Sequence, residues 1–125
     1  MALPHAQHLD VIGVRPLGEA LADAVSTSLI KTERLQLLHL VLPAHREVQE
    51  HRVDDECTLH CLEGEVEVVT GTVTKRLRAG ELVVLPALQP HALRARSDAA
   101  VLMTLLLRQG DAGDLGGEAV RRGSA

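Results

Sequence analysis

The chain has 125 residues, of which 46% are hydrophobic and 24% are charged, and its formal net charge is −4. These values predict one globular domain that is large enough to bury a hydrophobic core. The negative charge and the absence of Phe, Tyr and Trp argue against nucleic-acid binding, because the chain has neither an attraction for phosphate nor a ring on which bases stack.

Residues 1–33 are expected to form an N-terminal arm that packs on the remaining domain. The first residues lack the basic region and the apolar run of a secretory signal. Pro16, Glu19 and the alanines that follow predict one or two helical turns within residues 16–26. Because the longest apolar run, residues 99–107, is too short to span a bilayer, we expect a cytoplasmic protein that does not contact a membrane.

From about residue 35 onward the sequence predicts short β-strands that are separated by Gly or Pro. Such a series of strands indicates a closed all-β barrel or a sandwich, which we place at residues 34–108. Residues 109–125 are rich in Gly, Ala and charge, and they are expected to form a flexible tail. The apolar or alternating runs that predict the strands are residues 35–42, 57–62, 65–68, 73–77, 82–85, 90–96 and 100–107.

The two cysteines, Cys57 and Cys61, lie on one predicted strand. Four residues of extended chain separate their Cα atoms by about 13 Å, whereas a disulfide requires less than about 7 Å. We therefore expect two free thiols, which agrees with a reducing compartment such as the cytoplasm.

Two stretches that each join a histidine and a glycine contain the candidate functional residues. The first runs from His51 to Gly64 and the second from Gly80 to His91. Their spacing resembles the two motifs of the cupin family. The first motif is His-x-His, three or four residues, Glu, six residues and Gly, and the second is Gly, five residues, Pro-x-Gly, two residues and His. The positions that match are His51, Gly64, Gly80, Pro86 and His91.

The chain departs from the cupin pattern at four positions. Val53 stands where the second His belongs and Cys57 where the Glu belongs, so half of the metal ligands that the motif calls for are missing. In the second motif, Leu88 replaces Gly and Ala95 replaces Asn. The resemblance implies an all-β fold, the cupin double-stranded β-helix or jelly-roll barrel, with a short N-terminal helical turn.

Alternate residues of a strand lie on the same face, and this period predicts which side chains line the barrel. Cys57, for example, shares its face with Leu59 and Cys61, whereas His60 has the opposite parity and is expected to point away. The resemblance implies that His51 and His91 meet at the barrel mouth. Together these arguments predict a pocket lined by His51, His91, Cys57, Gln49, Leu59, Cys61, Leu93 and Met103.

The resemblance implies a divalent metal, but only two of its nitrogen ligands remain. Cys57 could add a thiolate, and the set of His51, His91 and Cys57 would favour Zn over Mn. Cys57 as a small buried apolar residue is the alternative. Two nitrogens alone hold a divalent ion weakly, so a metal-free site, in which the histidines act as hydrogen-bond donor and acceptor, remains equally open. We expect either no cofactor or one divalent ion, which would be Zn, Fe, Mn or Ni.

Three functions are compatible with this pattern. The preferred one is binding of a small, partly apolar molecule in the barrel, with His51 and His91 as polar anchors and a degenerate metal site. The second is a metal-dependent cupin enzyme of the dioxygenase, isomerase or decarboxylase type that uses the same histidines as ligands. The third is a structural dimer with a vestigial pocket. The first is preferred because no replacement for the missing ligands lies at the right strand parity.

A homodimer is expected in each case. Family resemblance implies it, and so do the two runs at residues 35–42 and 101–107, which are apolar on both faces. A single small barrel does not readily cover both faces of such runs.

Overall fold

The structure is a computed structural model and describes residues 5–107. One short 3-10 helix, η1 (Gly18–Asp23), precedes a series of β-strands. No helix among these residues is long and apolar enough to cross a membrane. The strands are β1 (Thr27–Lys31), β2 (Leu35–Leu42), β3 (Glu47–His51), β4 (Cys57–Glu63), β5 (Glu65–Thr70), β6 (Val73–Arg78), β7 (Leu82–Leu85), β8 (His91–Ala95) and β9 (Ala99–Leu106).

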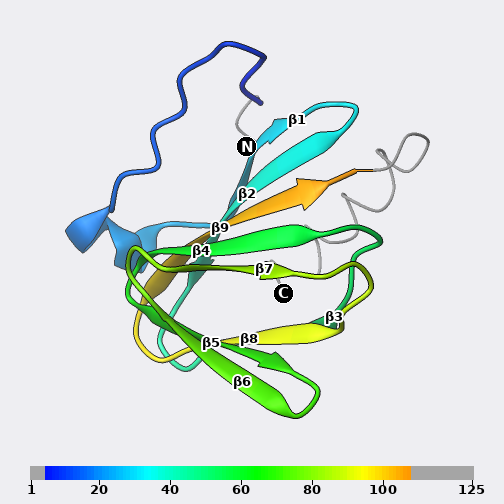
Figure 1. The fold of residues 1–125 in the computed structure, drawn as a ribbon. Helices are drawn as coiled ribbons and strands as arrows, with labels where there is room; N and C mark the ends of the chain where they lie inside the picture. Colours follow the sequence, from blue (N-terminus) through cyan, green and yellow to red (C-terminus); the bar gives the residue numbers. More distant parts are fainter. Residues whose placement is uncertain (1–4, 108–125) are drawn as a thin grey trace.

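The strands form two antiparallel sheets that face each other (Figure 1). Sheet A has five strands in the order β1-β2-β9-β4-β7, and sheet B has four in the order β3-β8-β5-β6. Within residues 5–107 no strand of one sheet is paired with a strand of the other, so the barrel is an open sandwich and not a closed cylinder. The predicted all-β jelly-roll fold is confirmed. The strand pattern allowed a closed barrel or a sandwich, and the structure has the sandwich form.

The predicted elements are present, together with two strands, β1 and β3, that lie outside the seven apolar runs. Each of the seven apolar runs after residue 35 forms a strand, and η1 lies inside the segment expected to be helical. The sequence did not predict β1, which belongs to the segment expected as an arm but pairs with β2 along the edge of sheet A. The expected tail, residues 109–125, lies outside the described residues.

The core lies between the two sheets and is aliphatic. Alternate residues of each strand point inward, as the register of Leu59 opposite Met103 shows for β4 and β9. Because the chain has no aromatic residue, Leu, Val, Met, Cys and Ala fill this layer. The inward side chains that are almost completely buried include Leu38, Leu40, Leu42, Val48, Leu59, Val66, Val68, Leu93, Val101, Met103 and Leu105.

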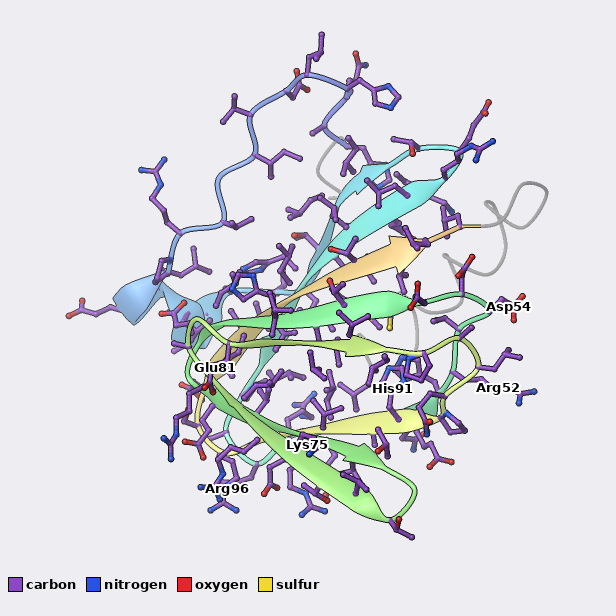
Figure 2. All side chains as sticks on the ribbon, in the orientation of Figure 1. Arg52, Asp54, Lys75, Glu81, His91 and Arg96 are labelled. Atoms are coloured by element: carbon purple, nitrogen blue, oxygen red, sulfur yellow. The ribbon has the colours of Figure 1, made fainter. Side chains whose placement is uncertain are left out.

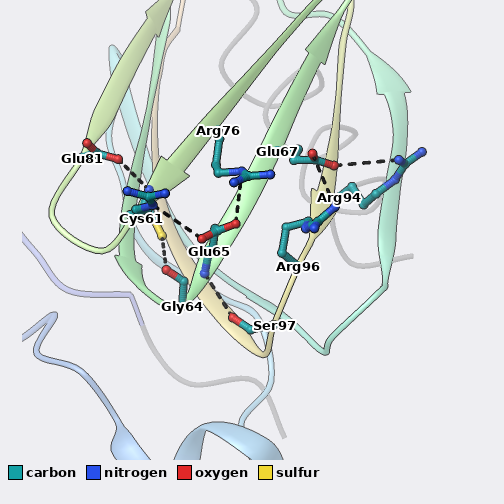
Figure 3. A network of polar contacts seen from close by, with 10 residues as sticks. Cys61, Gly64, Glu65, Glu67, Arg76, Glu81, Arg94, Arg96 and Ser97 are labelled. Atoms are coloured by element: carbon teal, nitrogen blue, oxygen red, sulfur yellow. Dashed lines mark hydrogen bonds and ion pairs between the residues drawn. The ribbon is translucent and has the colours of Figure 1, made fainter.

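The outer faces of the two sheets differ in charge. Sheet B carries acidic and basic side chains that alternate across its strands (Figure 3). Arg76 lies 3.2 Å from Glu65, and Glu67 lies 3.8 Å from both Arg94 and Arg96. These exposed pairs stabilise the fold little one by one, but they show that this face is solvated. Apart from Glu63 at the end of β4, the outward positions of β4, β7 and β9 in sheet A are uncharged: Thr58, His60, Leu82, Val84, Leu102, Thr104 and Leu106.

The N-terminal segment is tied to sheet A at two places. Near its start, the Ala6 N–H donates to the Leu29 carbonyl at 2.9 Å. Before η1, the N–H groups of Leu17 and Gly18 each donate to the Glu63 carboxylate at 2.8 Å. A carboxylate that accepts two backbone N–H groups makes strong, charge-assisted hydrogen bonds. The end of β4 therefore fixes where the helical turn begins.

The two motif glycines are required for different physical reasons. Gly64 has φ +77, and a Cβ at this position would lie 2.1 Å from the Asp98 carbonyl oxygen. Beside it, the Cys61 thiol donates to the Gly64 carbonyl at 3.4 Å. Gly80 has φ +90, but a Cβ there would meet open space. Gly64 is thus demanded by both conformation and close packing, and Gly80 by conformation alone.

Alanine at these two glycines should therefore have unequal costs. We expect Gly80→Ala to lower the free energy of unfolding by about 1–2 kcal/mol, which is the cost of the left-handed conformation. Gly64→Ala should lower it by ~3 kcal/mol or more, since the backbone near Asp98 must also move. Urea unfolding of the two variants measures the difference. Equal losses would contradict the close approach at Gly64.

Candidate functional site

The candidate site is a pair of histidines on neighbouring strands of sheet B. His51 ends β3, His91 begins β8, and the two residues are paired in the antiparallel register. Their ring centroids are 4.4 Å apart, and their exposed fractions are 7% and 1%. Figure 2 shows His91 between the sheets, at the end of the molecule that also carries Arg52 and Asp54. The predicted meeting of the two histidines is therefore seen in the structure.

A β-bulge in β3 directs His51 inward. Val48 is paired with Leu93 and His51 with His91, so three residues of β3 span the same length as two residues of β8. The extra residue changes the alternation, and Val48 and His51 are both buried while Gln49 is exposed. The prediction that the Gln49 side chain lines the pocket is therefore wrong, because strict alternation cannot account for a bulge.

The two imidazole rings are held by the same kind of hydrogen bond. His51 Nδ1 lies 3.1 Å from the Gln49 carbonyl oxygen, and His91 Nδ1 lies 3.0 Å from the Gln89 carbonyl oxygen. A carbonyl oxygen can only accept, so Nδ1 is the protonated nitrogen in each ring. These carbonyls were not predicted, and no signal in the sequence identifies them, because every residue carries one.

His91 is buried in its neutral form. Burial lowers the pKa of His91, the Gln89 hydrogen bond raises it, and the neighbouring His51 lowers it again. With Nδ1 protonated, Nε2 of His91 is a lone-pair acceptor. This atom is buried and has no hydrogen-bond partner within the described part of the chain. Buried polar atoms in native proteins are rarely left without a partner, so this one points to an occupant of the site.

Cys57 lies near the same end of the sandwich but does not form a metal site with the histidines. It begins β4, opposite Leu85 on one side and Leu105 on the other. Burial raises the pKa of its thiol to about 11, which disfavours the thiolate that binds metals. Val53, at the position of the missing second His, is also buried in the core.

The donor set therefore does not fit a resident divalent ion. Both Nε2 atoms have the tautomer that a metal needs. However, residues 5–107 contain no group of three or more His, Cys, Asp or Glu side chains placed to hold a metal ion. The expected set of His51, His91 and Cys57 is thus not assembled, and two nitrogens bind such an ion weakly.

The other predicted pocket residues are buried at different depths of the core. Leu59 pairs with Met103 across β4 and β9, one step inward from Cys57, and Leu93 follows His91 on the inner face of β8. Cys61 lies at the far end of β4, where its N–H donates to the Glu81 carbonyl at 2.9 Å. Figure 2 shows Glu81 at the opposite end of the molecule from His91, so Cys61 is remote from the histidine pair.

The loop before His91 contains a strained residue, Leu88. From the sequence this residue is recognised only as a departure from the cupin motif. Leu88 has φ 64, the conformation for which the cupin motif uses glycine. Its N–H donates to the Val53 carbonyl at 2.9 Å, which ties this loop to the one after β3. The turn has therefore kept its shape although its glycine is absent, and the strain lies three residues from His91.

An open sandwich of two antiparallel sheets, with two paired histidines at one end, defines a small jelly-roll protein. The cupin domain family matches residues 38–107, which is more than half of the chain, and the chain therefore belongs to the cupin family. No curated protein matches the chain.

Solved structures show the same fold. A cupin superfamily protein from Desulfitobacterium hafniense is 19% identical with a TM-score of 0.69, and the match covers 82% of this chain and all of that one. A conserved protein of unknown function from Streptococcus pyogenes is 22% identical with a TM-score of 0.66, and the match covers 86% of this chain and 96% of that one. An RmlC-like cupin from Shewanella frigidimarina is 20% identical with a TM-score of 0.62, and the match covers 69% of this chain and 78% of that one. At these identities the likeness establishes the fold alone.

Replacing Leu88 with glycine should stabilise the protein. The change relieves a left-handed conformation that costs about 1–3 kcal/mol, and the flexibility of glycine in the unfolded chain offsets about 1 kcal/mol of that gain. We expect the free energy of unfolding to rise by up to ~1 kcal/mol, as measured by urea denaturation. Ala87→Gly, at an exposed neighbour without a positive φ, is the control and should not stabilise. A loss of stability in Leu88→Gly would contradict the strain.

Proposed function

We propose that this cupin binds a small, partly apolar molecule at the open end of its sandwich, with His51 and His91 as polar anchors. The observation that carries the proposal is the buried, unpartnered Nε2 of His91 beside a second histidine. The core between the two sheets, into which the pair is buried, is aliphatic, and binding sites commonly combine an apolar lining with a few polar groups. The fold alone supports no particular activity, because cupin-like barrels carry many.

The metal-dependent enzyme is the weaker alternative. It requires a third ligand, and the nearest replacement in the motif, Cys57, is held in its protonated form by burial. A structural dimer with a vestigial pocket would leave the polarity of the histidine pair unexplained. A buried acceptor without a donor is costly, and it is not expected to persist in a site that binds nothing.

We also propose that the protein forms a homodimer through the outer face of sheet A. Leu82, Val84 and Leu106 are 57%, 53% and 43% exposed on this face. The outward positions of β4, β7 and β9 carry no charge except Glu63, whose carboxylate is engaged by the Leu17 and Gly18 N–H groups, in contrast to the ion pairs on sheet B. A second copy presents the same neutral apolar face, so a two-fold contact covers both at once.

A cytoplasmic location is proposed on the basis of the thiols. Cys57 and Cys61 are both free and buried, and neither has a partner cysteine within reach on its own strand. Proteins that keep their thiols reduced are typical of the cytoplasm.

The binding proposal predicts a stabilising ligand. In a thermal-shift screen of small alcohols, enols, amides and carboxylates, at least one compound should raise Tm, because a ligand at 100 times its Kd stabilises by about 2.7 kcal/mol. The shift should be lost in the double variant His51→Ala, His91→Ala and kept in His60→Ala, which alters the outer face. A flat screen on folded protein would favour the structural role.

The same preparation tests the enzyme alternative. Elemental mass spectrometry should find well below one divalent ion per chain, because two imidazoles alone bind weakly. Stoichiometric iron, manganese, nickel or zinc that disappears in the double histidine variant would contradict the proposal and support a metal-dependent enzyme.

The proposed interface predicts a dimer that charge disrupts. Sedimentation at micromolar concentration should show a dimer for the native chain. The double variant Leu82→Glu, Val84→Glu should sediment as a monomer, because it places carboxylates against an apolar partner face. Val73→Glu, at a similarly exposed valine on β6 of sheet B, is the matched control and should remain dimeric. A native monomer, or a dimer that survives the double variant, would contradict the interface.

A further inference from the structure

We infer that the His51–His91 site binds a neutral hydrogen-bond donor, a hydroxyl or an amide N–H on an apolar body, and discriminates against carboxylates. The inference rests on the proposed binding function and identifies the chemical class of its ligand. It follows from the protonation of the two rings, from the unpartnered atom, and from the absence of charge in the surrounding core.

The first step is the direction of the hydrogen bonds. Each Nδ1 must donate, since its partner is the carbonyl oxygen of Gln49 or Gln89, at 3.1 and 3.0 Å. A neutral imidazole has one proton, so its Nε2 can only accept. The bond to a residue two positions earlier recurs on both strands, and it gives the two rings the same polarity. The pair therefore offers two acceptors and no donor.

The second step is that the buried acceptor atom, Nε2 of His91, requires a hydrogen-bond donor. Nε2 of His91 is enclosed and lacks a partner within residues 5–107, although a second ring lies 4.4 Å away, centroid to centroid. His51 cannot supply a donor in its neutral form, because its only proton is engaged with Gln49. A ligand O–H or N–H satisfies the buried atom. A carboxylate brings only lone pairs, and it would need a proton that the neutral ring lacks.

The third step separates a neutral donor from a cationic one. The side chains that pack around this end of the core, Val53, Cys57, Leu85, Leu93 and Leu105, are all uncharged. Among residues 5–107, no Asp, Glu, Lys or Arg is buried. An ammonium group placed here would lose its hydration, and the carboxylates of the loop after β3, Asp54 and Asp55, are not buried in this core, so the transfer is unfavourable. A hydroxyl or amide loses less and gains the hydrogen bond.

Nitrogen NMR of protein with ¹⁵N-labelled histidine tests the first step without any ligand. At about pH 8, where an ordinary histidine is neutral, both rings should show a protonated Nδ1 and an unprotonated Nε2. A protonated Nε2 on either ring would overturn the inference, whatever the protein binds.

Four small probes of similar size test the ligand class at the same pH. n-Butanol and its isomer methyl propyl ether differ in the hydroxyl donor, and butyramide and butyrate differ in the amide N–H and the charge. Titration should move the Nε2 signal of His91 with butanol and butyramide, at a Kd at least ~10-fold lower than with the ether and butyrate. In His91→Phe, which removes the acceptor, the preference of butanol over the ether should vanish, as seen in Tm. His60→Gln should retain it.

The outcomes separate this inference from the function on which it rests. If butyrate binds as tightly as butyramide and the binding depends on the histidines, the ligand class is wrong and the binding function stands. If none of the four probes moves a histidine signal, both fail. If His91→Phe does not fold, the native-protein titration still decides, because the comparison of butanol with its ether isomer needs no variant.

Discussion

Burial of aliphatic side chains between the two sheets is the constraint on which the rest of the structure depends. With no aromatic residue in the chain, the layer is filled by short branched side chains, and each strand must present its apolar alternate positions inward. That requirement sets the register of β4 against β9 and leaves one face of each sheet outward. The close approach of Gly64 to the Asp98 carbonyl and the ties from Glu63 to the N-terminal segment then complete one end of the sandwich. The opposite end carries the histidines.

At that end, the polar rings of His51 and His91 are buried in an otherwise apolar layer that offers them few hydrogen-bond partners. His51 enters the interior through a bulge, and His91 follows a loop that holds Leu88 in a conformation normally reserved for glycine. Bulges and strained residues of this kind are common next to functional sites, where they direct a side chain that regular geometry would turn away. The two backbone carbonyls then set the protonation of both rings, so the site has a definite hydrogen-bonding character as well as a position.

The family pattern and the chemistry of this chain diverge at the metal ligands. Val53 and Cys57 have become part of the core, and burial keeps the Cys57 thiol protonated. What survives of the motif is the part that builds the fold, with two glycines and a proline, and two histidines that still face each other. A pair of neutral acceptors beside an aliphatic core is suited to a ligand that donates hydrogen bonds. The contrast between an ion-paired outer face on sheet B and the uncharged outward positions of β7 and β9 on sheet A adds a separate basis for self-association.

The sequence by itself determined the all-β class, because strand alternation is a property of consecutive residues. The jelly-roll form and the meeting of His51 with His91 followed from the resemblance of the two motifs to those of the cupin family. The prediction that Leu59, Cys61, Leu93 and Met103 face inward agrees with their burial in the core, whereas their role in lining a pocket stays a prediction. Only the tertiary structure decided that Gln49 is exposed, since a single extra residue in β3 shifts the alternation without leaving a sequence signal. Pairing with β2 likewise made a strand of β1, and distance in space separated Cys61 from the histidines. The tertiary structure also decided which nitrogen of each histidine ring donates and which accepts. This depends on backbone carbonyls, which every residue carries, and only the folded chain places a particular carbonyl next to a particular ring.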